Sequence, residues 1–178
     1  KGPIAAFRYL LLGTVGASMY LMGVGFLYAA TGTLNMADLS SHMPHLAESP
    51  LIILSIGCLI IGFGIKMALF PLHGWQPAAH PAADPMIAGI MIKVPAYAML
   101  RFFFCIFEDT SPVMDIFMDV IGFMAVCGVL FGSLKALRYD TYNKILAYSS
   151  IGQVGYIAMG FAIGNFYGLV GAILHIVS

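Results

Sequence analysis

Charged residues are scarce in this sequence. They make up 9% of the 178 residues, whereas 61% are hydrophobic and the mean hydropathy is +0.94. Soluble globular proteins carry roughly 25% charged residues. The composition therefore excludes an ordinary soluble domain and predicts an integral membrane protein.

Runs of basic residues are also missing. Eight basic and eight acidic side chains give a net charge of +0, and the basic ones are scattered along the chain. This pattern excludes the continuous basic segments that bind nucleic acids or attach a protein to anionic lipid. We expect no nucleic-acid partner.

The sequence has few cysteines, and they show no metal-ligand spacing. Cys58, Cys105 and Cys127 each lie inside an apolar run. A core position is a more common use of such a cysteine than redox chemistry or metal binding. We predict that all three are core residues and that the chain holds no metal or other cofactor.

Long apolar runs are abundant. A membrane-spanning helix needs about 20 mostly apolar residues, and such runs predict an all-α, polytopic helix bundle with a single membrane domain over residues 1–178. The chain starts without methionine and ends in an apolar run, so we expect a fragment of a longer protein. The predicted spans are 4–30, 50–70 followed by a half-helix over 71–80, 86–107, 113–137, 144–163 and a partial span over 166–178.

Loop charge predicts the orientation of these spans. Cytoplasmic loops of membrane proteins carry an excess of Lys and Arg. The loop over 31–49 has neither residue, and acidic residues follow Phe107. Basic residues flank the first span and the connection between the fourth and fifth, which lie on one side of a five-helix bundle. We therefore expect Lys1 to lie in the cytoplasm, most simply at a prokaryotic cell membrane.

The stretch KMALFPLHGWQPAAHP, from Lys66 to Pro81, indicates a broken helix at membrane depth. Pro71 cannot donate a hydrogen bond to the Met67 carbonyl, so the helix should end just after Lys66. Broken helices at this depth line protein-enclosed or watery cavities and build ion sites in transporters. The alternative is that Lys66 extends to the membrane surface. We favour a proton-transfer role for Lys66.

Lys93 lies deep in the third predicted span. A lysine there costs about 2.5–3.5 kcal/mol to insert, so it must face protein or water. Lys93, Tyr97 and Arg101 are spaced four residues apart and share one helix face. We predict proton transfer by Lys93 with a secondary role for Tyr97, and an interfacial or structural role for Arg101.

Three histidines complete the set of candidates. His175 lies inside the last apolar run, and its ordinary pKa of about 6.5 suits a proton relay, although a structural role is the alternative. His73 and His80 flank the expected break. We predict a secondary role for His73 at the break and an interfacial position for His80.

Three motifs in order carry a resemblance to a known family. They are KMALFPLHGWQPAAHP, IKVPAYAMLR from Ile92 and KILAYSSIGQVGYI from Lys144. Together they resemble the antiporter-like membrane subunits of complex I, the proton-pumping NADH:quinone oxidoreductase. The same superfamily includes subunits of membrane-bound hydrogenases and of Mrp-type cation/proton antiporters, and the resemblance covers nearly the whole chain.

The resemblance implies an architecture and roles. The family has about fourteen spans in two inverted repeats, each with a broken helix, and this chain would supply the sixth to tenth and part of the eleventh. Lys66 would be the pump lysine, Lys93 the linking lysine and His175 a relay on the central axis. The family's glutamate partner of the first lysine would lie on the fifth helix, outside this sequence.

Four residues depart from the family pattern. Gln76 stands where leucine is usual, Ala78 where aspartate is common and Thr141 where an aspartate precedes the third motif. Pro95 after Lys93 is also unusual and could bend its helix. These departures leave the subfamily open.

We expect a proton-translocating subunit that does no redox chemistry itself. Quinone, flavin or iron–sulfur centres would lie in partner subunits of a respiratory or hydrogenase complex. One alternative is a Na⁺/H⁺ antiporter subunit of Mrp type. Another is a structural membrane-arm subunit without transport.

Overall fold

The computed structural model describes residues 2–46, 48–80, 85–107 and 112–177. All regular secondary structure in these ranges is helical. The helices are α1 (Gly2–Thr31), α2 (Met36–Leu46), α3 (Pro50–Lys66), α4 (Gln76–Ala79), α5 (Pro85–Ile106), α6 (Pro112–Ala136), α7 (Tyr142–Ala162) and α8 (Phe166–Val177).

Four of the described helices are long and apolar enough to cross a membrane. They cover 3–31, 89–106, 112–136 and 142–162, while α3 and α8 are apolar but shorter. The expected all-α membrane fold is confirmed. The helix α3 has 17 residues and rises about 25 Å, because it ends at Lys66, where the sequence predicts a break within the apolar run over 50–70.

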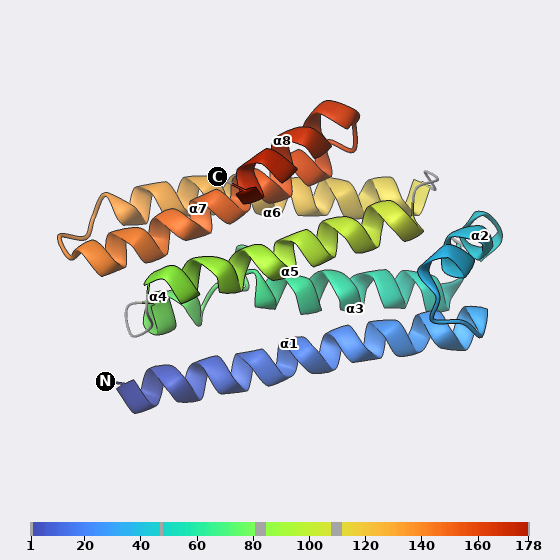
Figure 1. The fold of residues 1–178 in the computed structure, drawn as a ribbon, viewed down its shortest axis with the longest axis horizontal. Coiled ribbons are helices and arrows are strands. Elements are labelled where there is room, and N and C mark those ends of the chain that lie inside the picture. The colour runs from blue at the N-terminus through green and yellow to red at the C-terminus, as the bar shows by residue number, and fades with distance from the viewer. Residues whose placement is uncertain (1, 47, 81–84, 108–111, 178) are drawn as a thin grey trace.

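The long helices lie side by side along one direction (Figure 1). Helix α1 packs along α3, and α6 packs along α7. Helix α5 contacts both pairs through α3 and α7, while the short α4 contacts α1 and α7. The chain therefore forms two tight helix pairs that α4 and α5 connect.

Small residues allow the helices within each pair to approach closely. A Cβ atom added to Gly62 of α3 would lie 2.8 Å from the backbone nitrogen of Tyr20. A Cβ atom on Gly132 of α6 would lie 2.7 Å from the backbone nitrogen of Gly152. Ser55 also donates a buried hydrogen bond of 2.7 Å to the Gly23 carbonyl of α1. Such contacts replace the hydrophobic effect as the source of helix association in lipid.

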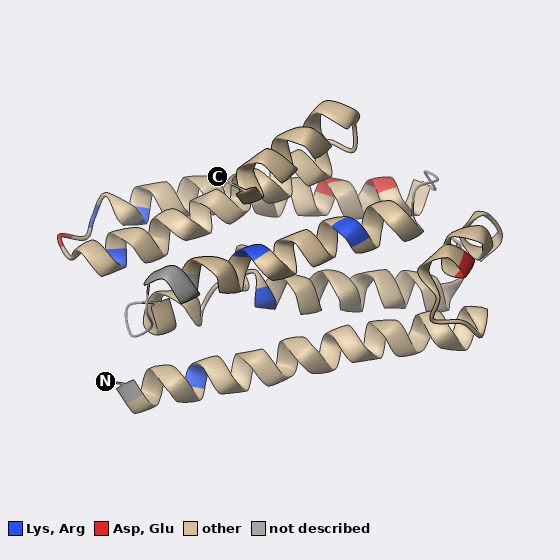
Figure 2. Ribbon diagram, in the orientation of Figure 1, with Lys and Arg blue, Asp and Glu red and all other residues tan. Residues whose placement is uncertain are grey.

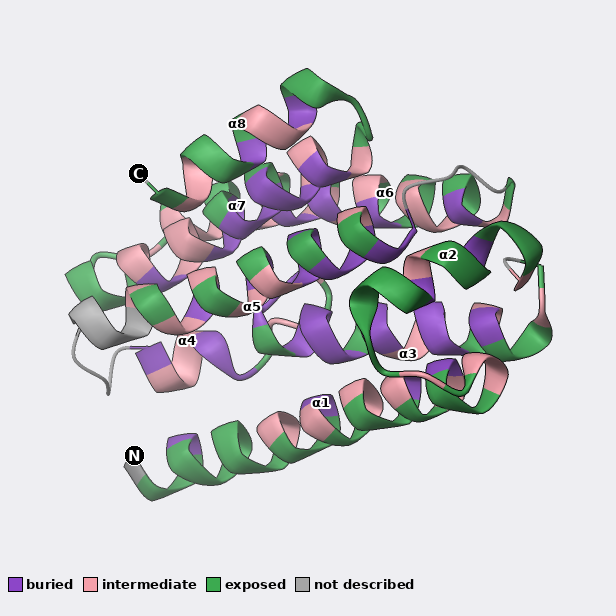
Figure 3. Cartoon of the chain, turned by 45° about the vertical axis from the view of Figure 1, so that its right-hand side comes forward, coloured by how far each residue is buried: buried purple, intermediate pink, exposed green. Residues whose placement is uncertain are grey.

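The buried residues lie mainly on helix faces toward the middle of the bundle (Figure 3). Ile52, Phe103 and Ile121 are each at most 1% exposed. The outer surface is apolar as well, since Phe123 is 72% exposed and Leu10 is 65% exposed. An apolar exterior suits a chain that contacts lipid or neighbouring membrane helices.

Two expectations from the sequence were wrong. The loop expected over 31–49 contains helix α2. The Asn35 side chain, just before this helix, accepts a hydrogen bond from the Ala37 backbone nitrogen, and the helix buries its residues Leu39 and Met43. This amphipathic helix of 11 residues is too short and too polar to cross a membrane. The cysteines are not core residues: Cys105 is exposed, and Cys58 and Cys127 are half-buried.

Acidic and basic side chains separate along the bundle (Figure 2). The acidic segments of α2 and of the start of α6 lie at the end away from the N-terminus. Basic segments predominate at the end that holds the N-terminus and the α6–α7 connection, where one acidic segment also lies, and other basic segments lie within α3 and α5. The bundle thus has ends of different charge.

Candidate functional site

Helix α3 ends at Lys66 through a specific set of backbone hydrogen bonds. The Leu69 nitrogen donates to the Gly64 carbonyl at 2.8 Å, and the Ala68 nitrogen donates to the Ile65 carbonyl at 3.3 Å. Ala68 has φ of 59°. These bonds around a left-handed residue form a Schellman motif, which usually has glycine at this position. The helix therefore stops immediately after the lysine.

The chain after this break remains mostly irregular. The half-helix expected over 71–80 corresponds to the four residues of α4, Gln76–Ala79. Pro71 lies five positions after Lys66 and prevents the helix from resuming at once. Leu72 donates its backbone N–H to the Leu69 carbonyl at 2.6 Å, so a tight turn fills the gap.

Trp75 joins the two sides of the break. Its indole Nε1 donates a buried hydrogen bond of 2.7 Å to the Ile65 carbonyl, which also accepts the hydrogen bond from the Ala68 nitrogen at the end of α3. Its ring meets the Tyr9 ring of α1 edge-on, with centroids 5.3 Å apart. Trp75 is only 6% exposed. The indole therefore fixes α4 against the residue that precedes Lys66.

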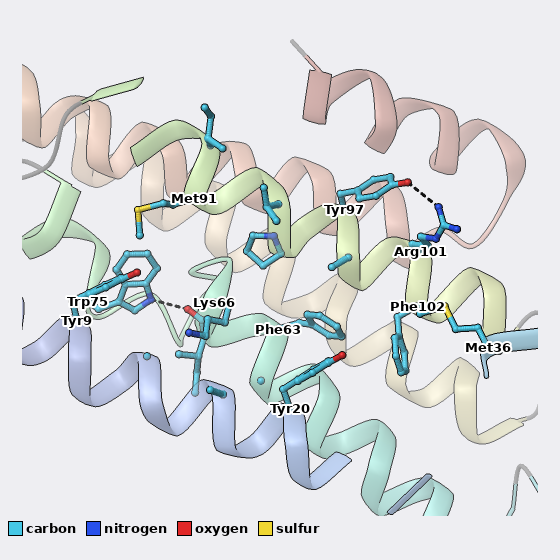
Figure 4. A pocket seen from close by; sticks show the side chains of 18 residues that line it. Tyr9, Tyr20, Met36, Phe63, Lys66, Trp75, Met91, Tyr97, Arg101 and Phe102 are labelled. Atoms are coloured by element: carbon cyan, nitrogen blue, oxygen red, sulfur yellow. Dashed lines mark hydrogen bonds between the residues drawn. The ribbon is translucent and has the colours of Figure 1, made fainter. Parts of the chain in front are cut away.

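Lys66 lines a cavity of about 740 Å³ between α1, α3 and α5 (Figure 4). Its ammonium nitrogen lies 3.8 Å from the point that a Cβ atom on Gly13 would occupy. The small Gly13 and Ala17 of α1 both line this space. The missing side chain at Gly13 thus leaves room beside the Lys66 ammonium group.

The cavity wall is largely apolar with a few polar groups. Tyr9, Tyr20, Tyr97 and Arg101 line it, and Arg101 Nη1 donates to the Tyr97 hydroxyl at 3.3 Å. No carboxylate is present among the described lining residues. A cavity with these groups can hold water and a proton, whereas hard cations such as Na⁺ prefer several oxygen ligands, including carboxylates.

Pro95 leaves one backbone carbonyl of α5 without its helical hydrogen-bond donor. Helix α5 continues through Pro95, whose ring nitrogen cannot donate to the Met91 carbonyl. Both residues line the Lys66 cavity. The cavity is therefore bordered by weakened backbone hydrogen bonding on α5 as well as by the end of α3.

The other predicted proton-transfer residues lie in different surroundings. Lys93 is half-buried and is not a lining residue of the Lys66 cavity, although Tyr97 of the same predicted face is. His175 is half-buried on α8, where its ring meets the Tyr156 ring edge-on with centroids 5.7 Å apart. The chain thus brings Lys66 and Tyr97 to one cavity, and Lys93 and His175 lie outside its wall.

His73 also lies outside this cavity. Its ring stacks on Phe70 at 5.3 Å and approaches Phe131 at 4.9 Å. Its buried Nδ1 has no hydrogen-bond partner among the described residues, and the same holds for both amide atoms of Gln76, which is 0% exposed. Buried polar atoms of this kind bind internal water. His80, expected at the interface, is 9% exposed at the end of α4.

Sequence reasoning missed three contributors to the site. Trp75 was part of the quoted motif, but nothing in the sequence indicated that its indole binds the Ile65 carbonyl. Gly13 was one of many helical glycines. Gln76 was recognised only as a departure from the family pattern. The sequence signal that could have found it is a polar amide side chain close to the predicted helix break.

Known proteins resemble the chain over nearly its whole length. The family model described as NADH:quinone oxidoreductase/Mrp antiporter, TM, matches residues 3–178. NADH-quinone oxidoreductase subunit N of Desulforudis audaxviator is 48% identical over 100% of this chain and 36% of its own length. A Na(+)/H(+) antiporter subunit of Bacillus subtilis is 35% identical over 97% of this chain and 35% of its own length.

Solved structures give the same result. The Mrp complex from Dietzia sp. contains a chain with a TM-score of 0.83 and 26% identity, covering 99% of this chain and 33% of that one. Respiratory complex I from Thermus thermophilus contains one with a TM-score of 0.69 and 30% identity, covering 97% and 38%. The chain thus spans about a third of the length of the relatives that it matches.

Proposed function

The chain belongs to the NADH:quinone oxidoreductase/Mrp antiporter family of transmembrane proteins, and on that premise we propose that it moves protons across a membrane through Lys66. One observation carries the proposal. Lys66 is the last residue of α3, and its side chain, which is exposed in this chain, lines a cavity of about 740 Å³. A lysine at such a position must be accommodated by water or protein, and a hydrated cavity lets it exchange its proton.

The remaining predicted residues extend this path. Lys93 and His175 would receive the proton farther along the membrane, with Tyr97 and His73 in secondary roles. If two lysines lie about 7 Å apart at an effective dielectric of about 20, charging one opposes charging the other by roughly 2.4 kcal/mol. That repulsion would let the charge of one site drive release from the next.

The chain would act within a larger assembly. Solved relatives come from multi-subunit membrane complexes, which supports other membrane subunits as partners. Redox cofactors such as quinone, flavin or iron–sulfur centres would belong to those partners, and this chain would contribute no redox step. We propose a prokaryotic cell membrane with the Lys1 end in the cytoplasm, in accord with the basic residues at that end of the bundle.

The test is proton uptake by the full-length protein in its assembled complex, reconstituted in vesicles. Lys66→Ala should abolish uptake. Lys66→Arg should also impair it severely, because a guanidinium group is too basic to release a proton readily. Lys135→Ala removes a cation of α6 that does not line the cavity and serves as the control. Normal uptake in both Lys66 variants would refute the proposal.

A Na⁺/H⁺ antiporter subunit is the second candidate. The Bacillus subtilis relative, which is a Na(+)/H(+) antiporter subunit, and the Mrp complex neighbour favour it. The missing carboxylates of the described cavity wall argue against Na⁺ binding beside Lys66. A sodium-dependent pH change in the same vesicles would support the antiporter, and uptake independent of sodium would support the proton pump.

A further inference from the structure

A second pocket lies at the end of the bundle that holds the N-terminus. It has a volume of about 330 Å³ and lies where α1, the chain before α4, and the start of α7 meet. Arg8 of α1 and Lys144 of α7 line it together with Tyr139, Tyr148 and His73. Arg8 and Lys144 are far apart in the sequence, so only the fold brings these two cations to one pocket.

The charged side chains that line the pocket are both basic. Neither acidic residue type occurs among its described lining residues, and neither Arg8 nor Lys144 forms an ion pair within the described part of the chain. The first turn of α7 adds positive potential, because the preceding Thr141 provides no side-chain cap for the exposed backbone N–H groups. Two cations and no carboxylate therefore line a polar recess, and the nearby Asp140 of the α6–α7 connection is not among its lining residues.

Aromatic rings hold the pocket in shape. The Lys144 ammonium lies 4.9 Å from the centroid of the Tyr139 ring, which stacks on Tyr148 at 5.1 Å with an interplanar angle of 8°. His73 is fixed on the opposite element by its stacking on Phe70. The cation of α7 is thus positioned by a ring, and phenol hydroxyl groups on the same wall can donate hydrogen bonds.

We propose that this pocket binds a phosphate group, and specifically the headgroup of an anionic phospholipid. Arg binds phosphate through paired hydrogen bonds and Lys through its point charge. Basic pockets between transmembrane helices near the membrane surface are suited to phospholipid headgroups. The apolar, exposed flank of α1 provides a surface for the acyl chains, since Ile4 and Phe7 beside Arg8 are 65% and 63% exposed.

Position along the membrane favours a lipid over a free ion. Arg8 lies in the second turn of α1, Lys144 in the first turn of α7, and Tyr139 in the connection between α6 and α7. The pocket is therefore near one end of the spans, at the depth where headgroups meet hydrocarbon. Inorganic phosphate offers the same chemistry without the acyl chains.

Native mass spectrometry of the full-length protein in its complex can test this site. The complex is released from nanodiscs of phosphatidylglycerol or phosphatidylcholine, and retained lipid is counted. We expect selective retention of phosphatidylglycerol and a loss of roughly tenfold or more in its affinity in the double variant Arg8→Gln/Lys144→Gln. The matched control is Lys135→Gln/Arg138→Gln, which removes two cations from the same end without touching the pocket.

Two further arms make the outcome decisive. The charge-preserving variant Arg8→Lys/Lys144→Arg should keep the lipid, which separates a lost site from a misfolded chain. Inorganic phosphate, added at constant ionic strength, should not displace the lipid; displacement with equal retention of both lipids would identify free phosphate as the ligand and overturn the lipid assignment. The phosphate site itself would be overturned if Arg8→Gln/Lys144→Gln and Lys135→Gln/Arg138→Gln both retained as much lipid as wild type. Equal loss of lipid in these two variants would also overturn it.

Discussion

Two lysines of this chain are each followed by a proline, yet their helices behave differently. After Lys66 the helix α3 ends, and Pro71 comes five residues later. After Lys93 the helix α5 continues through Pro95 to Ile106. Proline alone therefore does not decide where a membrane helix breaks.

The difference lies in the backbone between lysine and proline. Ala68 adopts φ of 59° and the following nitrogen returns to the Gly64 carbonyl, so α3 is already closed before Pro71. In α5 no such turn precedes Pro95, and the helix only loses one hydrogen bond. The end of α3 thus leaves Lys66 at the cavity, whereas the continuous α5 contributes Pro95 and Tyr97 to the cavity wall but not Lys93.

Among changes that keep Lys66 itself, the largest expected effect comes from filling the space beside its ammonium group. Gly13→Leu puts a side chain where the ammonium group lies 3.8 Å from a new Cβ atom. Overpacking costs about 1–3 kcal/mol, which corresponds to roughly five- to 160-fold in rate if the displaced lysine carries the proton. Proton uptake by reconstituted vesicles measures this.

Gly25→Leu is the matched control for Gly13→Leu. Gly25 belongs to the same helix, and a Cβ atom there would meet nothing within 4 Å. Its uptake should stay near wild type. Equal losses in both variants would show that α1 tolerates no leucine, and equal wild-type rates would show that the cavity beside Lys66 is not needed.

The sequence was sufficient to predict the apolar spans and the end of a helix at Lys66. Long apolar runs predict α1, α6 and α7 directly, because lipid solvates apolar side chains. The physical cause of the break was only partly predicted. Alanine at a left-handed position has no sequence signal, since glycine or asparagine is the residue expected there.

Contacts between distant residues could not be predicted at all. The position of Gly13 beside Lys66, and of Arg8 and Lys144 on the wall of one pocket, depends on how the helices pack. The scattered basic residues suggested no lipid site from sequence because their clustering arises only in three dimensions. Helix α2 was missed for a local reason, since its polar composition resembles a loop.

Removing the indole donor should have the next largest effect. Trp75→Phe keeps an aromatic ring against Tyr9 and loses the 2.7 Å hydrogen bond to the Ile65 carbonyl. A buried hydrogen bond contributes about 1 kcal/mol, so uptake should fall roughly fivefold as the end of α3 loosens. Tyr9→Phe keeps the edge-on contact and should have little effect; a Trp75→Phe variant with full activity would contradict the role of the indole.

A smaller effect is expected at the turn itself. Ala68→Gly relieves the left-handed conformation and should raise the free energy of unfolding by about 0.5–1 kcal/mol. Ala68→Val should lower it by about 1–3 kcal/mol, since a β-branched residue tolerates positive φ poorly. Titration of the purified protein with sodium dodecyl sulfate measures both changes. A destabilised glycine variant would mean that another feature ends α3.

The smallest effect is expected on α5, at the residue that shares the cavity with Lys66. Tyr97→Phe removes the hydroxyl that accepts the 3.3 Å hydrogen bond from Arg101, and both side chains are exposed. Such a bond contributes about 0.5 kcal/mol or less, so vesicle proton uptake should fall by less than about threefold. Arg101→Gln breaks the same bond from the other side and should match it. A tenfold loss confined to Tyr97→Phe would instead make its hydroxyl an essential proton carrier. A proton carrier would then lie on the continuous helix α5 as well as at the end of α3.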